Sequence, residues 1–255
     1  MACKVIAHRG SNKVCPQNTL PAFSQAIREK TNGFETDVHL SKDGVPVICH
    51  NYTINATSDG VGELSSYTLA ELKKFDFGGY FSADFKNTPI PTLEEFLKLV
   101  APTATDIINI ELKYEKERMG ELVRKTLECV KKYGLLDRVI ISSFSPNILK
   151  SVKETEARCK TAFLYPTMMI TACRPIMNPF FIAKRIGADI LHPASVVVSK
   201  PLVAIAHKLG MKVNVWTVND EKTVRFLLSC GVDGIITDCP AKVRKIIDKF
   251  ERANS

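Results

Sequence analysis

The stretch FETDVHLSKDGVPVICH, residues 34–50, decides the fold. It holds two strand-like runs, Phe34–Leu40 and Val45–His50, which only Ser41-Lys42-Asp43-Gly44 separates. Four residues are too few for a parallel crossover, and Asp-Gly is a strong signal for a tight hairpin. The second run is therefore predicted to return antiparallel to the first. A turn centred between Asp43 and Gly44 places position 37 opposite position 50.

Outside this hairpin, short β-rich runs alternate with amphipathic helical runs along the chain, a pattern typical of parallel strands covered by helices. The expected strands are Lys4–His8, Phe34–Leu40, Val45–His50, Asp106–Leu112, Arg138–Phe144, Lys160–Tyr165, Ala188–His192, Lys212–Val218 and Gly234–Thr237. The expected helices include Leu20–Lys30, Leu93–Val100, Glu117–Tyr133, Pro201–Leu209, Glu221–Cys230 and Ala241–Phe250.

Nine strands are one too many for an eight-stranded barrel, but the hairpin's return strand accounts for the surplus. The remaining eight βα units predict an α/β fold, a TIM (β/α)8 barrel, in a single domain over residues 1–255. The alternative is a doubly wound open sheet. It is disfavoured because no glycine-rich dinucleotide motif follows the first strand.

Residues 51–91 interrupt the alternation. They contain turn signals such as Ser58-Asp59-Gly60 and Gly78-Gly79, and no clear barrel element. We interpret them as a small insertion after the hairpin, at the C-terminal mouth of the barrel, where loops commonly shape the substrate site. The aromatic rings of this insertion are expected either to form a small core of its own or to present an apolar wall to the substrate. They are Tyr52, Tyr67, Phe75, Phe77, Tyr80, Phe81 and Phe85.

The composition, 45% hydrophobic and 24% charged residues, is typical of a globular protein. No apolar run approaches the ~18 residues needed to cross a bilayer, and residues 1–6 show no secretory signal. We therefore expect a cytoplasmic protein without integral membrane association. The eight cysteines, Cys173 among them, form no CxxC pair and are expected to be thiols. The net charge of +8 comes from scattered Lys and Arg, which disfavours nucleic-acid binding and suits a small substrate carrying phosphate.

Acidic side chains stand near the ends of two predicted strands. Glu35 and Asp37 share one face because they are two residues apart, and Glu111 ends the strand Asp106–Leu112. No cationic neighbour of these acids is obvious from the sequence, and carboxylates that converge at a barrel mouth repel one another unless a cation offsets them. Oxygen ligands favour a hard divalent cation, Mg²⁺ or Ca²⁺, over zinc. The sequence thus predicts a metal site.

Two histidines are expected near these acids. His8 ends the first strand and the hairpin returns His50 to the same neighbourhood, so they are candidates for a general acid and base pair. His39 and His192 are competitors, because the first shares a face with Asp37 and the second also ends a strand. Which imidazole would act as acid is not indicated by the sequence.

Three further side chains are candidates for contacts with the substrate. Arg9 and Lys113 offer cationic donors suited to phosphate oxygens. Trp216, the only tryptophan, lies late in a predicted strand and is expected to line the substrate pocket.

The order of these motifs resembles the glycerophosphodiester phosphodiesterase family over essentially the whole chain. The resemblance is carried by His8-Arg9-Gly10, Gln17-Asn18-Thr19, Glu35-Thr36-Asp37-Val38, Lys42-Asp43-Gly44-Val45-Pro46-Val47 with His50, Glu111-Leu112-Lys113, Val213-Asn214-Val215-Trp216-Thr217-Val218-Asn219 and Gly231-Val232-Asp233-Gly234-Ile235-Ile236-Thr237-Asp238.

This resemblance implies a TIM barrel with an insertion and metal-dependent hydrolysis of glycerophosphodiesters to glycerol 3-phosphate and an alcohol. It implies His8 and His50 as the catalytic histidines. It further implies the acids Glu35, Asp37 and Glu111 as metal ligands, and the basic residues Arg9 and Lys113 as phosphate contacts. The chain departs from the family pattern at Gln17, where the family usually has Glu, and at Asn51, where it usually has Asp.

Three alternatives remain. A lysophospholipase D-like phosphodiesterase would use the same site beside an apolar groove for an acyl chain. A phosphosugar isomerase or synthase usually binds phosphate on a glycine-rich loop after strand seven or eight, where this chain has Asn219-Asp220-Glu221 and Asp238-Cys239-Pro240. A non-catalytic phosphodiester-binding barrel would follow only if the departures at Gln17 and Asn51 have abolished turnover. The oligomeric state is left open.

Overall fold

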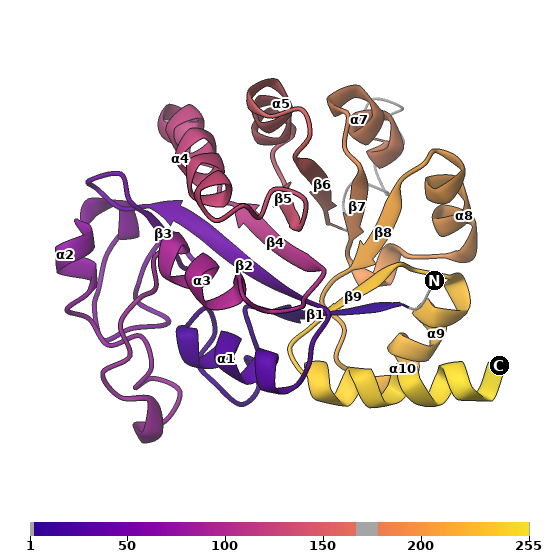
Figure 1. Cartoon of the computed structure of the whole chain (residues 1–255), viewed down its shortest axis with the longest axis horizontal. Coiled ribbons are helices and arrows are strands. Elements are labelled where there is room, and N and C mark those ends of the chain that lie inside the picture. Colours follow the sequence, from indigo (N-terminus) through magenta and orange to yellow (C-terminus); the bar gives the residue numbers. More distant parts are fainter. Residues whose placement is uncertain (1–2, 167–177, 255) are drawn as a thin grey trace.

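The computed structural model describes residues 3–166 and 178–254 and contains a closed barrel of eight parallel strands (Figure 1). Going round the barrel, the strand order is β1-β9-β8-β7-β6-β5-β4-β2, and pairing of β1 with β2 closes it. The TIM barrel is therefore confirmed. The barrel strands are β1 (Lys4–His8), β2 (Gly33–Leu40), β4 (Ile107–Leu112), β5 (Val139–Ser143), β6 (Lys160–Tyr165), β7 (Ile190–Pro193), β8 (Lys212–Val215) and β9 (Gly234–Thr237).

The return strand β3 (Pro46–Ile48) lies antiparallel to β2, but its predicted register is wrong by one residue. Val38 pairs with Ile48, and the Cys49 N–H donates to the Asp37 carbonyl at 3.1 Å, so position 37 faces position 49. The turn is a three-residue loop rather than a two-residue one. Gly44 adopts a φ of 76° at its end, a left-handed conformation that glycine reaches without strain.

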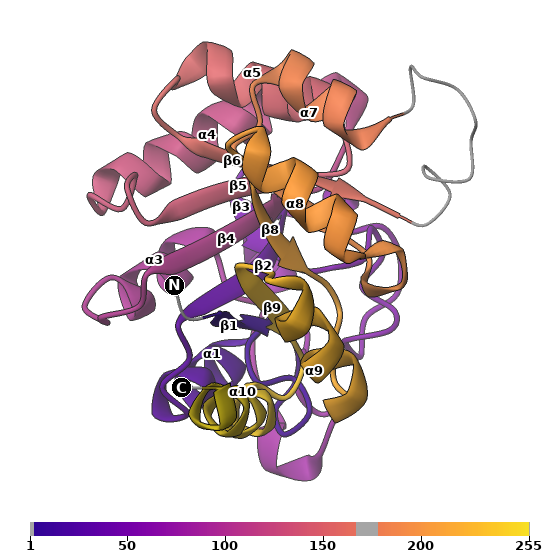
Figure 2. The ribbon, with the colours of Figure 1, turned by 90° about the vertical axis from the view of Figure 1, so that its right-hand side faces the viewer.

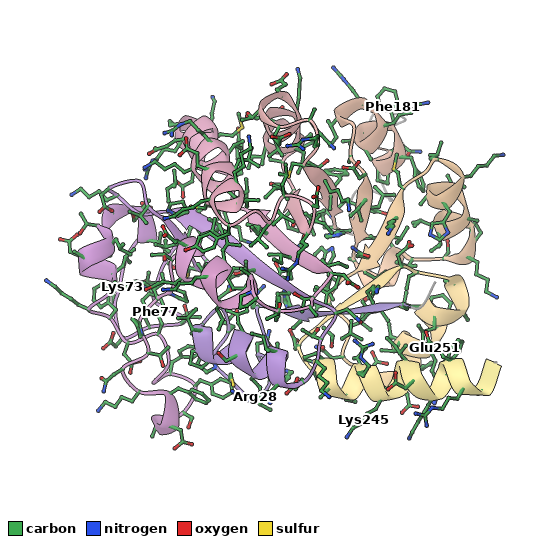
Figure 3. All side chains as sticks on the ribbon, in the orientation of Figure 1. Arg28, Lys73, Phe77, Phe181, Lys245 and Glu251 are labelled. Carbon is green, nitrogen blue, oxygen red and sulfur yellow. The ribbon has the colours of Figure 1, made fainter. Side chains whose placement is uncertain are left out.

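Helices surround the strands on the outside of the barrel (Figures 1 and 2). They bury one apolar face each; in α3 (Leu93–Val100), for example, Leu93, Phe96, Leu97 and Val100 face the core. Thr92 and Glu95 form a capping box that starts this helix. The other long helices are α1 (Leu20–Arg28), α4 (Met119–Lys132), α5 (Pro146–Thr155), α7 (Pro179–Ile186), α8 (Lys200–Lys208), α9 (Glu221–Cys230) and α10 (Pro240–Asn254). Figure 3 shows Phe181 and Lys245 on the outer faces of α7 and α10.

The insertion between β3 and α3 contains only short helices: η1 (Leu64–Ser66), α2 (Leu69–Leu72) and η2 (Ala83–Phe85). It builds a small core of its own on the hairpin, from Val47, Cys49, Ile54, Leu64, Leu72, Phe77 and Ile90. Tyr67 and Phe75 pack against this core, whereas Tyr52, Tyr80 and Phe81 are exposed. The expected core of the insertion is thus present, and an apolar wall toward the substrate stays a prediction.

Among the described residues, no helix is long and apolar enough to cross a membrane. The seven cysteines in the described ranges are free thiols, and Cys173 lies outside those ranges.

Candidate active site

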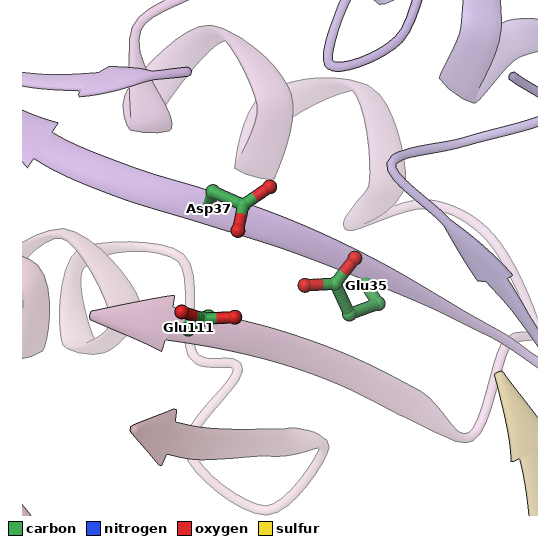
Figure 4. Close-up of side chains that lie close together, drawn as sticks. All are labelled: Glu35, Asp37 and Glu111. Atoms are coloured by element: carbon green, nitrogen blue, oxygen red, sulfur yellow. The ribbon is translucent and has the colours of Figure 1, made fainter. Parts of the chain in front are cut away.

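The three predicted acids meet on one face of two neighbouring strands. β2 and β4 pair in a register that sets Glu35 beside Asn109 and Asp37 beside Glu111. Because side chains two residues apart share a face, Glu35, Asp37 and Glu111 converge, as Figure 4 shows. One oxygen from each carboxylate lies within 4.8 Å of the others, and all three residues are buried.

These carboxylates carry more negative charge than their surroundings readily stabilise. Burial, and then the negative charge of Asp37, raise the pKa of Glu35 well above its usual range and that of Glu111 to about 7. Burial also disfavours the charged form of Asp37, but Lys113 and Arg9 hold its pKa well below the usual range. A buried set of oxygen donors with surplus negative charge fits a hard divalent cation.

Two cations lie next to the acids, although no such neighbour of Glu35 and Asp37 is obvious from the sequence. The Lys113 ammonium lies 2.7 Å from Asp37 Oδ1 and 2.5 Å from Glu111 Oε1. Arg9 Nε lies 3.3 Å from Asp37 Oδ2, and Arg9 also donates to the side-chain oxygen of Gln17. The three carboxylates, when all are ionised, carry one more charge than Lys113 and Arg9 balance.

His8 is oriented by a carboxylate that the sequence analysis did not assign to the site. Its Nδ1 lies 2.6 Å from Asp238 Oδ1, and Asn12 and Asn219 donate to the same carboxylate at 2.8 and 2.6 Å. Burial opposes the charge on Asp238, but the hydrogen bond and charge of His8 hold the Asp238 pKa well below its usual range. A signal for Asp238 was present, because it directly follows the last strand, as Arg9 follows β1 and Trp216 follows β8. His8 Nε2 lies 3.9 Å from Glu35.

His50 has a different partner. Its Nδ1 donates to the side-chain oxygen of Asn51 at 2.6 Å, and burial lowers the pKa of His50. The competitor His39 is buried and donates to the His50 carbonyl at 3.4 Å. The other competitor, His192, is fully buried beside Asn214, and burial lowers its pKa to about 3. Neither competitor lines the cavity described next.

A cavity of ≈ 100 Å³ opens between these groups at the mouth of the barrel. Trp216 forms part of its wall: the ring packs edge-on against Phe144, and its Nε1–H donates to the His192 carbonyl at 2.7 Å. Asp37 and Lys113 are not part of the wall and reach the site through their ion pairs. The lining residues are His8, Arg9, Glu35, His50, Asn109, Glu111, Phe144, Leu164, Trp216, Thr217 and Ile236.

Comparison with known proteins identifies the family. The family model described as the glycerophosphoryl diester phosphodiesterase family matches residues 8–242. The chain belongs to this family. Membership confirms the resemblance found in the sequence and the predicted enzyme class, a glycerophosphodiester phosphodiesterase.

Relatives and solved structures of the family match nearly the full chain. A glycerophosphodiester phosphodiesterase of Caldanaerobacter subterraneus is 35% identical, covering 98% of this chain and 99% of the relative. One of Bacillus altitudinis is 34% identical, covering 97% and 99%. The structure of an Oleispira antarctica phosphodiesterase in complex with the product sn-glycerol-3-phosphate superposes with a TM-score of 0.89 at 29% identity, covering 97% of each chain.

Proposed function

We propose that this phosphodiesterase hydrolyses glycerophosphodiesters to glycerol 3-phosphate and an alcohol, by general acid and base catalysis at His8 and His50 with a divalent cation. The proposal rests on one observation: two imidazoles, a cluster of acids and an arginine line one cavity at the barrel mouth. The product complex of the Oleispira antarctica relative supports glycerol 3-phosphate as a product here too.

The hydrogen-bond partners of the two imidazoles support different roles for them. In both rings Nδ1 donates to an oxygen, which leaves Nε2 for proton transfer. His50 faces a neutral amide, and burial lowers the pKa of His50. Its neutral form therefore accepts the proton of the attacking group, which is water or the glycerol 2-hydroxyl. His8 faces the charged Asp238, which stabilises a positive ring, so His8 protonates the oxygen of the leaving alcohol.

Glu35, Asp37 and Glu111 would hold the cation, Mg²⁺ or Ca²⁺. When bound, a divalent cation neutralises phosphodiester oxygens and makes the phosphorus easier to attack. Arg9, on the cavity wall, donates to a non-bridging phosphate oxygen, and Lys113 pairs with Asp37 and Glu111 and holds both carboxylates in place. Trp216 packs against the organic part of the substrate.

The cavity volume favours a small polar substrate over a lysophospholipid, because ≈ 100 Å³ suits a glycerol unit and not an acyl chain. The proposed partner is thus a small glycerophosphodiester. A cytoplasmic location and the absence of nucleic-acid binding stay predictions.

Release of glycerol 3-phosphate from glycerophosphocholine tests the proposal. Exhaustive chelation is expected to stop release, and Mg²⁺ or Ca²⁺ to restore it. Glu111→Gln should lower the rate, whereas Glu128→Gln, which changes an exposed acid on α4, serves as the matched control and should not. Full turnover after chelation would contradict the role of the cation.

A further inference from the structure

Asn109 lies at the level of Glu35 and deeper in the barrel than the other two acids of the site, Asp37 and Glu111. It stands on β4 two residues before Glu111 and pairs with Glu35 across the sheet, so its side chain points to the same interior face. Two residues of a parallel strand span roughly 6–7 Å, which sets Asn109 one layer below Glu111. It also lines the cavity at the barrel mouth.

The amide nitrogen of Asn109 has a hydrogen-bond partner, and the amide oxygen has none among the described residues. Its Nδ2 donates to Ser142 Oγ at 3.0 Å, which fixes the orientation of the amide plane. Its Oδ1 is buried and accepts no hydrogen bond from any residue in the described ranges 3–166 and 178–254. The residue is only 1% exposed. A buried acceptor without a donor is costly, and the residue that carries this acceptor lines the cavity.

The apolar side chains Leu164 and Ile236 line the same cavity and offer no donor. Without substrate, a water molecule can fill the role of donor, because a cavity of ≈ 100 Å³ is large enough for one. A substrate that displaces this water must bring a hydroxyl or amine of its own to Asn109 Oδ1.

We infer that Asn109 determines specificity by accepting a hydrogen bond from the C1 hydroxyl of the substrate's glycerol unit, which enters the cavity first. This inference rests on the proposed function. We place the phosphate beside Arg9 and the upper acids Asp37 and Glu111, and the C1 hydroxyl is the glycerol oxygen farthest along the chain from phosphorus. That hydroxyl therefore reaches the lower layer, and the leaving alcohol points out of the barrel.

The same geometry excludes one substrate class. A 1-acyl lysophospholipid carries an ester where the free C1 hydroxyl should be, so it presents no donor to Asn109 and brings an acyl chain into a small cavity. The site therefore selects water-soluble glycerophosphodiesters over lysophospholipids.

Two choline phosphodiesters test the inference: glycerophosphocholine, and the analogue built on propane-1,2-diol, in which hydrogen replaces the C1 hydroxyl. The readout is choline release, measured as kcat/KM. The wild-type protein is expected to prefer glycerophosphocholine by roughly 10- to 100-fold, because the analogue leaves a buried acceptor unpaired. It should disfavour 1-acyl lysophosphatidylcholine by roughly 100-fold or more.

Asn109→Ala should reduce the preference to within roughly threefold, through a lower kcat/KM for glycerophosphocholine and little change for the analogue. Thr126→Val is the matched control. It also removes a buried oxygen that has no partner among the described residues, but on α4 and away from the cavity, and should keep the wild-type preference.

Equal wild-type rates on the two diesters, a preference that survives in Asn109→Ala, or efficient turnover of the lysophospholipid would overturn the inference. The wild-type comparison decides the point even if Asn109→Ala does not fold. No choline release from any of the three compounds would instead contradict the proposed function, and the inference with it.

Discussion

His50 donates to the neutral amide of Asn51 at 2.6 Å, whereas His8, at the same distance, pairs with the carboxylate of Asp238. The two proposed catalytic imidazoles thus differ in the charge of their partners and not in geometry. A neutral partner suits the proposed role of His50 as the base, and a carboxylate partner suits the proposed role of His8 as the acid.

Asn51→Asp should move the acidic limb of the pH profile. A carboxylate beside His50 stabilises the protonated ring and raises its pKa, so a higher pH is needed to obtain the neutral base. We expect the acidic limb of kcat/KM to shift upward by roughly one pH unit. Asn55→Asp, elsewhere in the insertion, is the control and should not shift the limb. An unmoved or downward-shifted limb in Asn51→Asp would show that His50 is not the base.

Mg²⁺ or Ca²⁺ should stabilise the folded protein. A cation that binds only the folded state at 100-fold over its Kd adds about 2.7 kcal/mol, which corresponds to a rise in Tm of roughly 5–10 °C. Thermal melts with and without cation measure this rise. Glu111→Gln should lose most of it and Glu128→Gln should keep it. An equal rise in both variants would place the cation elsewhere.

Trp216 should report substrate binding, because it is the only tryptophan and lies on the cavity wall. Glycerophosphocholine added to the His50→Ala variant, which should bind without turnover, is expected to quench or shift the emission. Calorimetry establishes saturation independently. Unchanged emission at saturation would mean that the indole only closes the top layer of the barrel.

The exposed rings of the insertion should influence which alcohol is accepted. Tyr80 Oη accepts from the Gln17 N–H at 3.2 Å, so this part of the insertion meets the loop after β1 that starts with Arg9. Tyr80→Ala and Phe81→Ala should change the ratio of rates between glycerophosphocholine and glycerophosphoethanolamine. A cation–π contact of ~0.5–2 kcal/mol corresponds to a change of roughly 2- to 30-fold.

The control for this ratio is Phe226→Ala, which removes an exposed ring on α9 outside the insertion. Metal dependence should stay unchanged in all three variants. A ratio that is the same in folded Tyr80→Ala and Phe81→Ala would assign alcohol selectivity to the barrel loops instead.

The barrel could be predicted from the sequence because strand-like and helical runs alternate along the chain, and each run shows its pattern within a few residues. The short hairpin loop also identified β3 as the ninth strand, which is antiparallel and does not belong to the eight parallel strands of the barrel. The register within the hairpin could not be predicted, since Asp43-Gly44 fits both a two-residue turn and a three-residue loop. The left-handed conformation of Gly44 in the structure distinguishes them.

In the candidate site, too, the features set by local sequence could be predicted and those set by distant contacts could not. The shared face of Glu35 and Asp37 follows from strand periodicity, which the sequence shows. The Lys113–Asp37 ion pair depends on the pairing of β2 with β4 across the insertion, and the His8–Asp238 hydrogen bond on β9 closing against β1. Contacts between residues so distant in sequence require the closed barrel.

The release of glycerol 3-phosphate from glycerophosphocholine, compared among wild type, His8→Ala and His50→Ala in saturating cation, tests the central claim most directly. The account predicts release by the wild type and a loss of roughly 10²–10⁴-fold in each variant, with unchanged melting temperatures. His207→Ala, which changes a surface histidine paired with Asp233, should retain the wild-type rate. Near-normal release by folded His8→Ala or His50→Ala would contradict the account.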